Sequence, residues 1–353
     1  MTAPYSQTTL LLENASPLKK RNYDESKRKG RQVAVLSKFK LTLLIVNIAA
    51  AMFMFLVFRY IFNDSFFTNS SGIVYGASFP DLNVDVYSEL ETELEAHVHS
   101  RNAVLKVRDA GSNVKTQAKQ IQELAESGAE TIFVCPVKSE GLDEALKKSR
   151  EMGCRIITLG NIYKSCENID HAISSENHEA GLQMASCLKG AMDHGKILIV
   201  GEEDSELSYE RMTGFSDYFL YDDDYDATEV VLTNGKSEAV MDVLIEKMKS
   251  SGRYDAIFAT SDSIGMGAYA ALKELGYAEQ TMIFTVDGSP DGRKMVKAGR
   301  FYASSGIYPS EIAKRAVELS FSDGSDSHED IERIPVRLIT KTTISSYDLS
   351  KWK

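Results

Sequence analysis

From Gly72 onward the chain alternates between short β-type runs and segments with helical periodicity, and this repeat constrains the fold more than any other feature. The runs that we expect to be strands fall in two series: 72–78, 103–109, 130–135 and 155–160, then 196–201, 227–232, 255–260 and 281–287. Their spacing of roughly 25–32 residues is the length of one strand plus one crossover helix. The runs are apolar throughout, which predicts parallel strands buried on both faces by helices.

The segments between these runs have the features of helices. In residues 114–128 apolar side chains recur at helical spacing, and Gly128 ends the segment as a good helix terminator. Residues 261–276 begin with Ser-Asp, which is typical of a helix N-terminus, and stop at Gly276. The sequence therefore predicts an α/β fold with two successive doubly wound lobes, each built on a parallel sheet.

One acidic residue stands at the tip of a predicted strand. Asp287 ends the apolar run "TMIFTVD", where a carboxylate is costly to bury unless polar groups bond it. In open parallel sheets, the residues that face ligands lie just beyond the carboxyl ends of the strands. We therefore interpret Asp287 as a ligand-binding residue. The alternative is that it caps the turn before "SPDGRKMVKAG".

An uncharged apolar run, Leu41 to Phe58, separates a basic N-terminal segment from an acidic remainder. Residues 1–40 carry a net charge of +6, whereas the whole chain of 353 residues carries −11, which leaves −17 for the rest. Extended to residue 62, the run is about 33 Å long as a helix, enough for a bilayer core of about 30 Å. We predict a disordered basic cytoplasmic tail (1–40), a transmembrane helix (41–62) and a linker (63–71).

Two other interpretations compete with a membrane anchor. A buried helix of a soluble protein is usually shorter and amphipathic. A cleaved signal peptide has an apolar stretch of about 7–15 residues and a cleavage site of small residues, whereas "RYIFNDSFF" follows here. We therefore expect a retained single-pass anchor in the cell membrane, with the basic N-terminus cytoplasmic and the acidic bulk extracytoplasmic.

Motifs of the common enzyme and metal-site classes are missing from the sequence. There is no G-x-x-x-x-G-K-[ST], G-x-S-x-G or H-E-x-x-H, and the four cysteines lack zinc spacing. Cys135 and Cys154 flank predicted strands and are interpreted as core residues, while a Cys166–Cys187 disulfide stays open. We predict a protein that is not an enzyme and needs no cofactor or metal. The acidic charge argues against a nucleic-acid partner.

Four segments, in their order and spacing, resemble the type I periplasmic sugar-binding proteins of the ribose- and galactose-binding group, which share their fold with lactose-repressor-type effector domains. These segments are "KQIQELAESGAETIFVCPVKSEGLDEALKKSREMGCRIITL", "YERMTGF", "DAIFATSDSIGMGAYAALKELG" and "VDGSPDGRKMVKAGRFYASSGIYPSEIAKRAVE". The resemblance covers nearly all of 72–340. It implies two lobes joined by three hinge strands that close on a small polar solute.

The resemblance also implies the boundaries of the lobes. The N-terminal lobe is expected to comprise 72–174 and 307–336, and the C-terminal lobe 175–306 and 337–353. The hinge crossings are then expected near Ala172–Ser175, Ser304–Tyr308 and Pro335–Leu338.

Site residues follow from the resemblance one position at a time. Arg211 matches the arginine of the family motif R-x-x-G-F/W, and Asp287 matches the aspartate of its D-G pair; both groups suit vicinal hydroxyls. Where many relatives carry Asp-Arg and Asn-Asp, this chain has Gly160-Asn161 and Ser261-Asp262, so ribose itself is not predicted. The predicted ligand-binding residues are Arg211, Asp287, Asn161, Ser261, Phe79, Tyr308, Asp81, Asp109 and Asn177.

Three of these residues have simpler alternatives. Arg211 could be a surface charge at the start of a helix, and Asp109 and Asn177 could be helix N-caps.

The overall prediction is a membrane-anchored solute-binding protein that delivers a sugar-like ligand to an ABC importer. The alternative is a sensor whose closed form signals to a membrane histidine kinase.

Overall fold

The computed structural model describes residues 72–352 except 162, 164, 166, 204, 234 and 322–330, together with 21, 25, 28, 46–48, 50 and 52–54. The predicted tail, transmembrane helix and linker therefore lie almost entirely outside the described residues. Within the part that is described, no helix combines the length and the apolar character needed to cross a bilayer.

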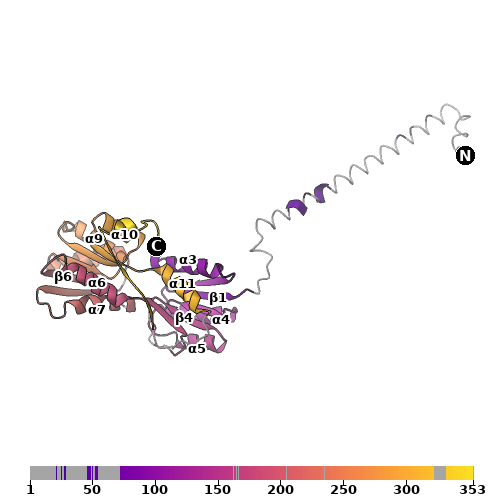
Figure 1. Ribbon diagram of the computed structural model, residues 1–353, viewed down its shortest axis with the longest axis horizontal. Coiled ribbons are helices and arrows are strands. Elements are labelled where there is room, and N and C mark those ends of the chain that lie inside the picture. Colours follow the sequence, from indigo (N-terminus) through magenta and orange to yellow (C-terminus); the bar gives the residue numbers. More distant parts are fainter. Residues whose placement is uncertain are drawn as a thin grey trace, which may run out of the picture. The chain divides into compact units, whose positions relative to one another are not determined.

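Six parallel strands form the sheet of the N-terminal lobe (Figure 1). Their order across the sheet is β11 (Glu332–Ile334), β5 (His171–Ser175), β4 (Arg155–Leu159), β3 (Thr131–Val134), β1 (Val74–Phe79) and β2 (Val104–Asp109). The helices of this lobe are α3 (Asp85–His99), α4 (Val114–Glu126), α5 (Asp143–Glu151) and α11 (Pro309–Leu319). Although α11 is far from α3 in sequence, the two helices lie side by side.

A second sheet of six strands forms the C-terminal lobe. Its order is β12 (Arg337–Thr340), β10 (Ala303–Gly306), β9 (Met282–Asp287), β8 (Ala256–Ala259), β6 (Gly195–Glu202) and β7 (Tyr225–Leu232). Only the β10–β12 pair is antiparallel. The helices are α6 (Asn177–Lys189), α7 (Glu206–Tyr218), α8 (Ser237–Ser251), α9 (Asp262–Glu274), α10 (Pro290–Lys297) and the short η1 (Ile344–Ser346). The prediction of two α/β lobes on parallel sheets is confirmed.

The chain passes from one sheet to the other at three places. It leaves β5 for α6, leaves β10 for α11, and runs from β11 directly into β12. We call these the first, second and third crossings. The strands that flank them, β5, β10, β11 and β12, have only three to five residues each and were not among the predicted strands.

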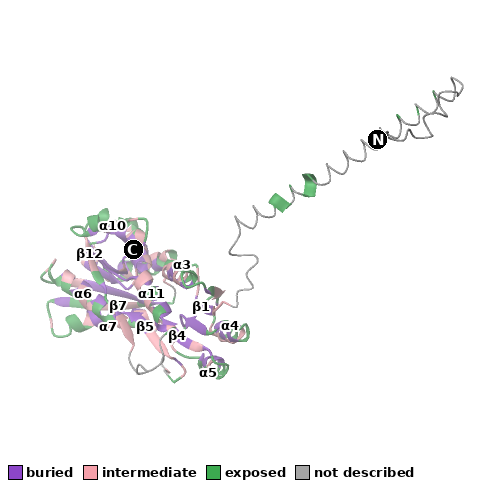
Figure 2. Cartoon of the chain, turned by 45° about the vertical axis from the view of Figure 1, so that its right-hand side comes forward, coloured by how far each residue is buried: buried purple, intermediate pink, exposed green. Residues whose placement is uncertain are grey.

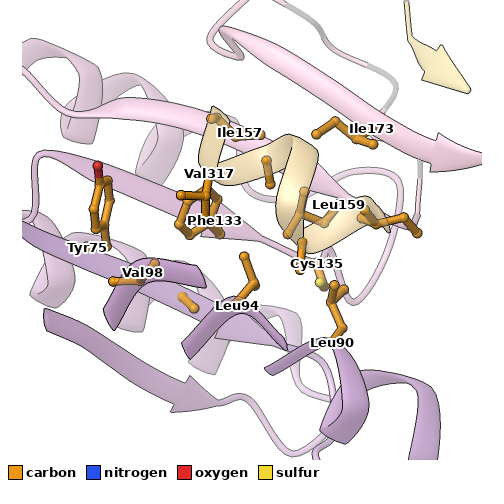
Figure 3. Close-up of a cluster of buried hydrophobic side chains, with 14 of the residues drawn as sticks. Tyr75, Leu90, Leu94, Val98, Phe133, Cys135, Ile157, Leu159, Ile173 and Val317 are labelled. Atoms are coloured by element: carbon orange, nitrogen blue, oxygen red, sulfur yellow. The ribbon is translucent and has the colours of Figure 1, made fainter. Parts of the chain in front are cut away.

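The inner strands are buried on both faces, as continuous apolar runs require, and Figure 2 shows them largely in the colour of buried residues. The edge strands β2 and β7 differ, because most of their residues are half-buried or exposed. In the N-terminal lobe one core cluster joins β1, β3 and β4 to α3 and α11. Figure 3 shows Val317 of α11 beside Phe133 and Ile157 of the sheet. Cys135 and Cys154 are both buried, which confirms their interpretation as core residues. The open question of a disulfide involves Cys166, which lies outside the described residues.

The helix boundaries follow local chemistry. The Asn113 side chain accepts a hydrogen bond from Thr116 N and caps α4, and Ser261 caps α9 in the same way through Ile264 N. Gly128 and Gly276 follow the two helices with φ angles of 86° and 75°, a region that favours glycine. The predicted helices 114–128 and 261–276 are therefore confirmed to within two residues at each end.

Candidate ligand-binding site

A buried ion pair lies at the carboxyl edge of the C-terminal sheet. Arg211 of α7 donates from Nη1 to Asp287 Oδ1 at 2.9 Å, and their side chains are 6% and 14% exposed. The same nitrogen donates to Thr260 O at 2.7 Å, and Nε donates to Asn177 Oδ1 at 3.0 Å. Arg211 is thus held on three sides, and the alternative that it is a surface charge is wrong.

Asp287 has an unusual backbone. Its φ is 117°, a region that residues with a side chain rarely adopt. The conformation turns the chain at the end of β9, where Ile307 N donates to Asp287 O at 3.0 Å. Asp262 N donates to the second carboxylate oxygen, Oδ2, at 3.3 Å. The carboxylate therefore faces Arg211 and the N-terminus of α9.

The charge of Asp287 is only partly stabilised. The pKa of Asp287 is raised to about 7, because burial and the nearby Asp262 carboxylate raise it by more than the Arg211 guanidinium lowers it. Asp262 is itself 2% exposed and accepts bonds from Ser289 N, Ser289 Oγ and Thr285 Oγ1 at 2.6–2.7 Å. A ligand that donates hydrogen bonds to Asp287 would stabilise its ionised form.

Two polar side chains, those of Asn161 and Tyr87, form the part of the candidate site that belongs to the N-terminal lobe. Asn161 follows β4, and its Nδ2 donates to Pro136 O at 3.0 Å and to the Tyr87 hydroxyl at 3.4 Å. Among the described residues, the buried Asn161 Oδ1 has no hydrogen-bond partner, so it is an acceptor available to a ligand. Burial raises the pKa of Tyr87, whose hydroxyl also feels the charges of Arg211 and Asp287.

Tyr87 was not predicted from the sequence, where Phe79 and Tyr308 were the aromatic candidates. It lies on the first turn of α3, three residues after Val84, and its hydroxyl lies near residues of both lobes. The signal that could have found it is its position in the helix that follows the first strand, since the first turn of such a helix faces the carboxyl edge of the sheet.

Phe79 and Tyr308 do not join this group of residues. Phe79 ends β1 but is 1% exposed and packs in the core cluster of the N-terminal lobe. Tyr308 lies under the Arg337 guanidinium, 4.5 Å from the ring centroid, and burial beside Tyr347 raises its pKa to about 12. Neither ring has a contact with the Arg211–Asp287 pair among the described interactions.

The remaining predicted residues serve local structure. The Asp81 carboxylate accepts bonds from Asn83 N and Nδ2 at 2.9 and 2.8 Å, which lower its pKa, and Asp109 accepts from Gly111 N at 2.9 Å. Ser261 Oγ accepts from Ile264 N at 3.2 Å as the α9 cap.

The N-cap alternatives for Asp109 and Asn177 are both wrong. Asp109 is the last residue of β2, and Asn113 is the residue that caps α4. Asn177 is the first residue of α6, whose N-cap position is held by Glu176.

A cavity of about 630 Å³ lies between the loop that follows β3 and helix α7. Neither Arg211 nor Asp287 lines it. Six acidic side chains and one basic side chain, that of Lys138, line the cavity. The acidic residues are Glu140, Glu202, Glu203, Glu206, Asp217 and Glu229.

Comparisons with known proteins agree with this arrangement. Residues 75–322 match the family model described as periplasmic binding protein domain. A xylitol-binding protein of Mycolicibacterium smegmatis is 24% identical over 263 residues, covering 73% of each chain. The ribose import binding protein RbsB of Salmonella typhimurium is 25% identical over 227 residues, covering 61% of this chain and 73% of its own.

Solved structures share the fold. An ABC transporter solute binding protein of Bacillus halodurans with bound myo-inositol superimposes with a TM-score of 0.73 at 19% identity, covering 80% of this chain and all of the other. A myo-inositol binding protein of Caulobacter gives a TM-score of 0.72 at 20% identity, covering 80% and 98%. The chain has two α/β lobes with polar side chains at the carboxyl edges of their sheets, and the family model matches most of its length. This chain therefore belongs to the periplasmic binding protein domain family.

Proposed function

We propose that this chain binds a small polyhydroxylated solute, a sugar or a polyol, and closes around it by a hinge motion at the three crossings. The observation that carries the proposal is the buried Arg211–Asp287 pair, which lies near the Tyr87 hydroxyl of the other lobe. A guanidinium group offers donors in a fixed plane, and a carboxylate offers only acceptors. Together with the amide of Asn161, these groups match the hydroxyls of a sugar, each of which both donates and accepts.

The relatives support this class of ligand. Their names give ribose, xylitol and D-allose as the bound solutes, and the solved structures contain myo-inositol or D-allose. All of these are neutral and rich in neighbouring hydroxyl groups. The relatives are binding proteins, which supports a function without catalysis.

We further propose that the chain is anchored in the cell membrane by residues 41–62, with its N-terminus in the cytoplasm and its binding lobes outside. The apolar run and the basic segment before it support this orientation. Delivery to an ABC importer is supported by relatives that are named as import or ABC transporter proteins. Protease protection of the full chain in intact cells tests the orientation: residues 72–352 are expected to be cleaved from outside, and protection of the lobes would contradict it.

Ligand binding is tested by thermal unfolding of the full chain in detergent with D-ribose, xylitol, D-allose and myo-inositol. A ligand at 100 times its dissociation constant is expected to add about 2.7 kcal/mol to the stability of the lobes. Arg211→Ala and Asp287→Ala are expected to abolish this gain, because each removes one half of the ion pair.

The control is Lys294→Ala, which breaks an exposed ion pair with Asp291 on α10 of the same lobe. This variant is expected to keep the full stabilisation by ligand. Unchanged affinity in both the Arg211 and Asp287 variants would show that the site lies elsewhere.

A further inference from the structure

Three hydrogen bonds, two of them buried and one partly buried, run in series from the C-terminal lobe to the N-terminal lobe. Arg211 Nε donates to Asn177 Oδ1 at 3.0 Å, Asn177 Nδ2 donates to Ser174 Oγ at 3.1 Å, and Ser174 Oγ donates to Gly160 O at 2.7 Å. We call this series the crossing relay. Arg211, Asn177 and Ser174 are 5%, 0% and 1% exposed, so water does not compete for these bonds.

The two ends of the crossing relay lie in the two halves of the candidate site. Arg211 pairs with Asp287 in the C-terminal lobe. Gly160 directly precedes Asn161, whose free acceptor and bond to Tyr87 form the part of the site in the N-terminal lobe. Between them, the relay passes through the first crossing, because Ser174 belongs to β5 and Asn177 begins α6.

The Asn177 amide has a fixed orientation. Its Nδ2 donates one hydrogen to Ser174 Oγ and the other to Ser175 O at 3.0 Å, so both donors are engaged with β5. Oδ1 must then point toward Arg211. Because every polar atom of this fully buried side chain has a protein partner, Asn177 has no group left for a ligand.

We infer that Asn177 and Ser174 are positioning residues that make the orientation of Arg211 depend on the geometry of the first crossing. This inference rests on the proposed function. Hinge motion changes the backbone dihedral angles of crossing segments. Residues 175–177 lie between Ser174 and the Asn177 amide, so a change of the backbone there alters the Asn177–Ser174 bond, the one bond of the relay that joins the two lobes. The orientation of Arg211 is thereby coupled to the arrangement of the lobes.

The test compares two buried serines of the same sheet in the full chain. Ser174→Ala removes the middle of the relay but leaves the bond between Asn177 and Arg211. Ser78→Ala is the matched control, because Ser78 on β1 is 0% exposed and its hydroxyl has no partner among the described residues. Dissociation constants for D-ribose, xylitol, D-allose and myo-inositol are measured by calorimetry, and melting temperatures are measured without ligand.

Ser174→Ala is expected to weaken binding of the preferred solute about five- to tenfold, the effect of one lost buried hydrogen bond, while Ser78→Ala stays within about twofold of the wild type. A merely structural role would lower the melting temperature and leave affinity unchanged. Asn177→Asp is the second variant: it keeps the acceptor for Arg211 but loses both donors to β5, and it is expected to weaken binding at least as much.

The outcomes separate the inference from the proposed function. If the wild type binds one of the four solutes and both relay variants bind it equally well, the inference is overturned and the proposed function stands. If the wild type binds none of them, the proposed function is overturned, and the crossing relay loses its role with it.

Discussion

Asp287 combines a strained backbone with a buried charge at one position. A φ angle of 117° outside glycine costs about 1–3 kcal/mol, and such strain persists only where surrounding structure maintains it. The structure that maintains it here is the bond from Ile307 N together with the contacts of the carboxylate with Arg211 and Asp262 N. Asp287→Asn keeps the size and shape of the side chain and removes its charge, so it probes the charge at this position.

The raised pKa of Asp287 predicts a pH dependence of stability. The folded chain holds this proton more tightly than the unfolded chain, because the pKa is about 7 in the fold against an ordinary value of 3.8. The contribution of Asp287 to stability is therefore full below pH 3.8 and is lost as the pH rises through about 7. As the pH rises from 4 to 8, the free energy of unfolding of Asp287→Asn is expected to increase by about 1–2 kcal/mol relative to that of the wild type. The gain is kept this small because Arg211 stabilises the charged form of Asp287 in the wild type.

Urea unfolding of both proteins at several pH values measures this difference. A constant difference between the variant and the wild type across that range would contradict the raised pKa.

The Tyr87 hydroxyl is the second residue-scale feature that can be tested. It accepts a bond from Asn161 and stays protonated because burial raises its pKa, so its own hydrogen is available to a ligand. Tyr87→Phe is expected to weaken solute binding about five- to tenfold with little change in stability. The control is Tyr209→Phe, because Tyr209 is 64% exposed on α7. Equal affinities of the two variants would exclude Tyr87 from the site.

At the scale of elements, the third crossing is flanked by two arginines that each pair with the opposite lobe. Arg333 lies on β11 of the N-terminal lobe and makes a two-bond ion pair with Glu210 of α7 at 2.8 and 3.0 Å. Arg337 lies on β12 of the C-terminal lobe and pairs with Glu311 of α11 at 3.0 Å. The short segment Ile334–Val336 between them thus has an interlobe ion pair at each end.

The two pairs differ in burial, which predicts different energies. The side chains of Arg333 and Glu210 are 33% and 17% exposed, whereas those of Arg337 and Glu311 are 57% and 43% exposed. Arg333→Gln is expected to cost about 1–3 kcal/mol of stability, because it leaves a half-buried carboxylate without its partner. Arg337→Gln is expected to cost about 0–1 kcal/mol. Urea unfolding in low salt measures both, and equal costs would contradict this ranking.

At the scale of the whole molecule, the C-terminal segment connects the C-terminal lobe with the crossings. The fully buried Arg293 donates to the carbonyls of Asp348, Lys351 and Trp352, and its guanidinium lies over the Tyr347 ring. This holds Trp352 in a core cluster that contains Ile307 of the second crossing and Val336 of the third. The indole nitrogen also donates to Ile307 O at 3.2 Å.

Because the chain has one tryptophan, its fluorescence is expected to report hinge closure. A solute that closes the lobes changes the surroundings of residues 307 and 336, so the Trp352 emission should shift or change in intensity at saturation. Stopped-flow fluorescence measures the change, and Trp352→Phe is the control that removes the signal. A solute that raises the melting temperature without any change in emission would argue against movement at these crossings.

Much of the fold could be predicted from the sequence, because the residue patterns that indicate strands and helix ends are local in the chain. Continuous apolar runs at regular spacing predicted eight of the parallel strands, and the capping residues around α4 and α9 predicted where those helices begin and end. The strands at the crossings were missed because they are both short and rich in polar side chains, with sequences HAISS, ASSG, ERI and RLIT, so no continuous apolar run marks them.

The site was predicted less well, because side-chain direction depends on tertiary packing. A strand-tip aspartate and an arginine in a recognisable motif were found, and the structure joins them at 2.9 Å. Phe79 and Tyr308 were predicted as the aromatic residues of the site, but the packing of α3 and α11 on the sheet encloses the Phe79 ring in the core, and the Tyr308 ring lies under Arg337. The Tyr87 hydroxyl instead interacts with the charges of the ion pair. Asn177 was chosen as a ligand contact, but its amide is engaged by Arg211 and β5.

That this chain builds two α/β lobes on parallel sheets follows from the sequence alone, because strand and helix patterns depend on residues close together along the chain. Which polar groups meet depends on the tertiary structure, since the crossings bring together residues far apart in the sequence, such as Arg333 and Glu210, which are 123 positions apart. Pairing across that distance is set by the packing of whole elements, and no local pattern encodes it.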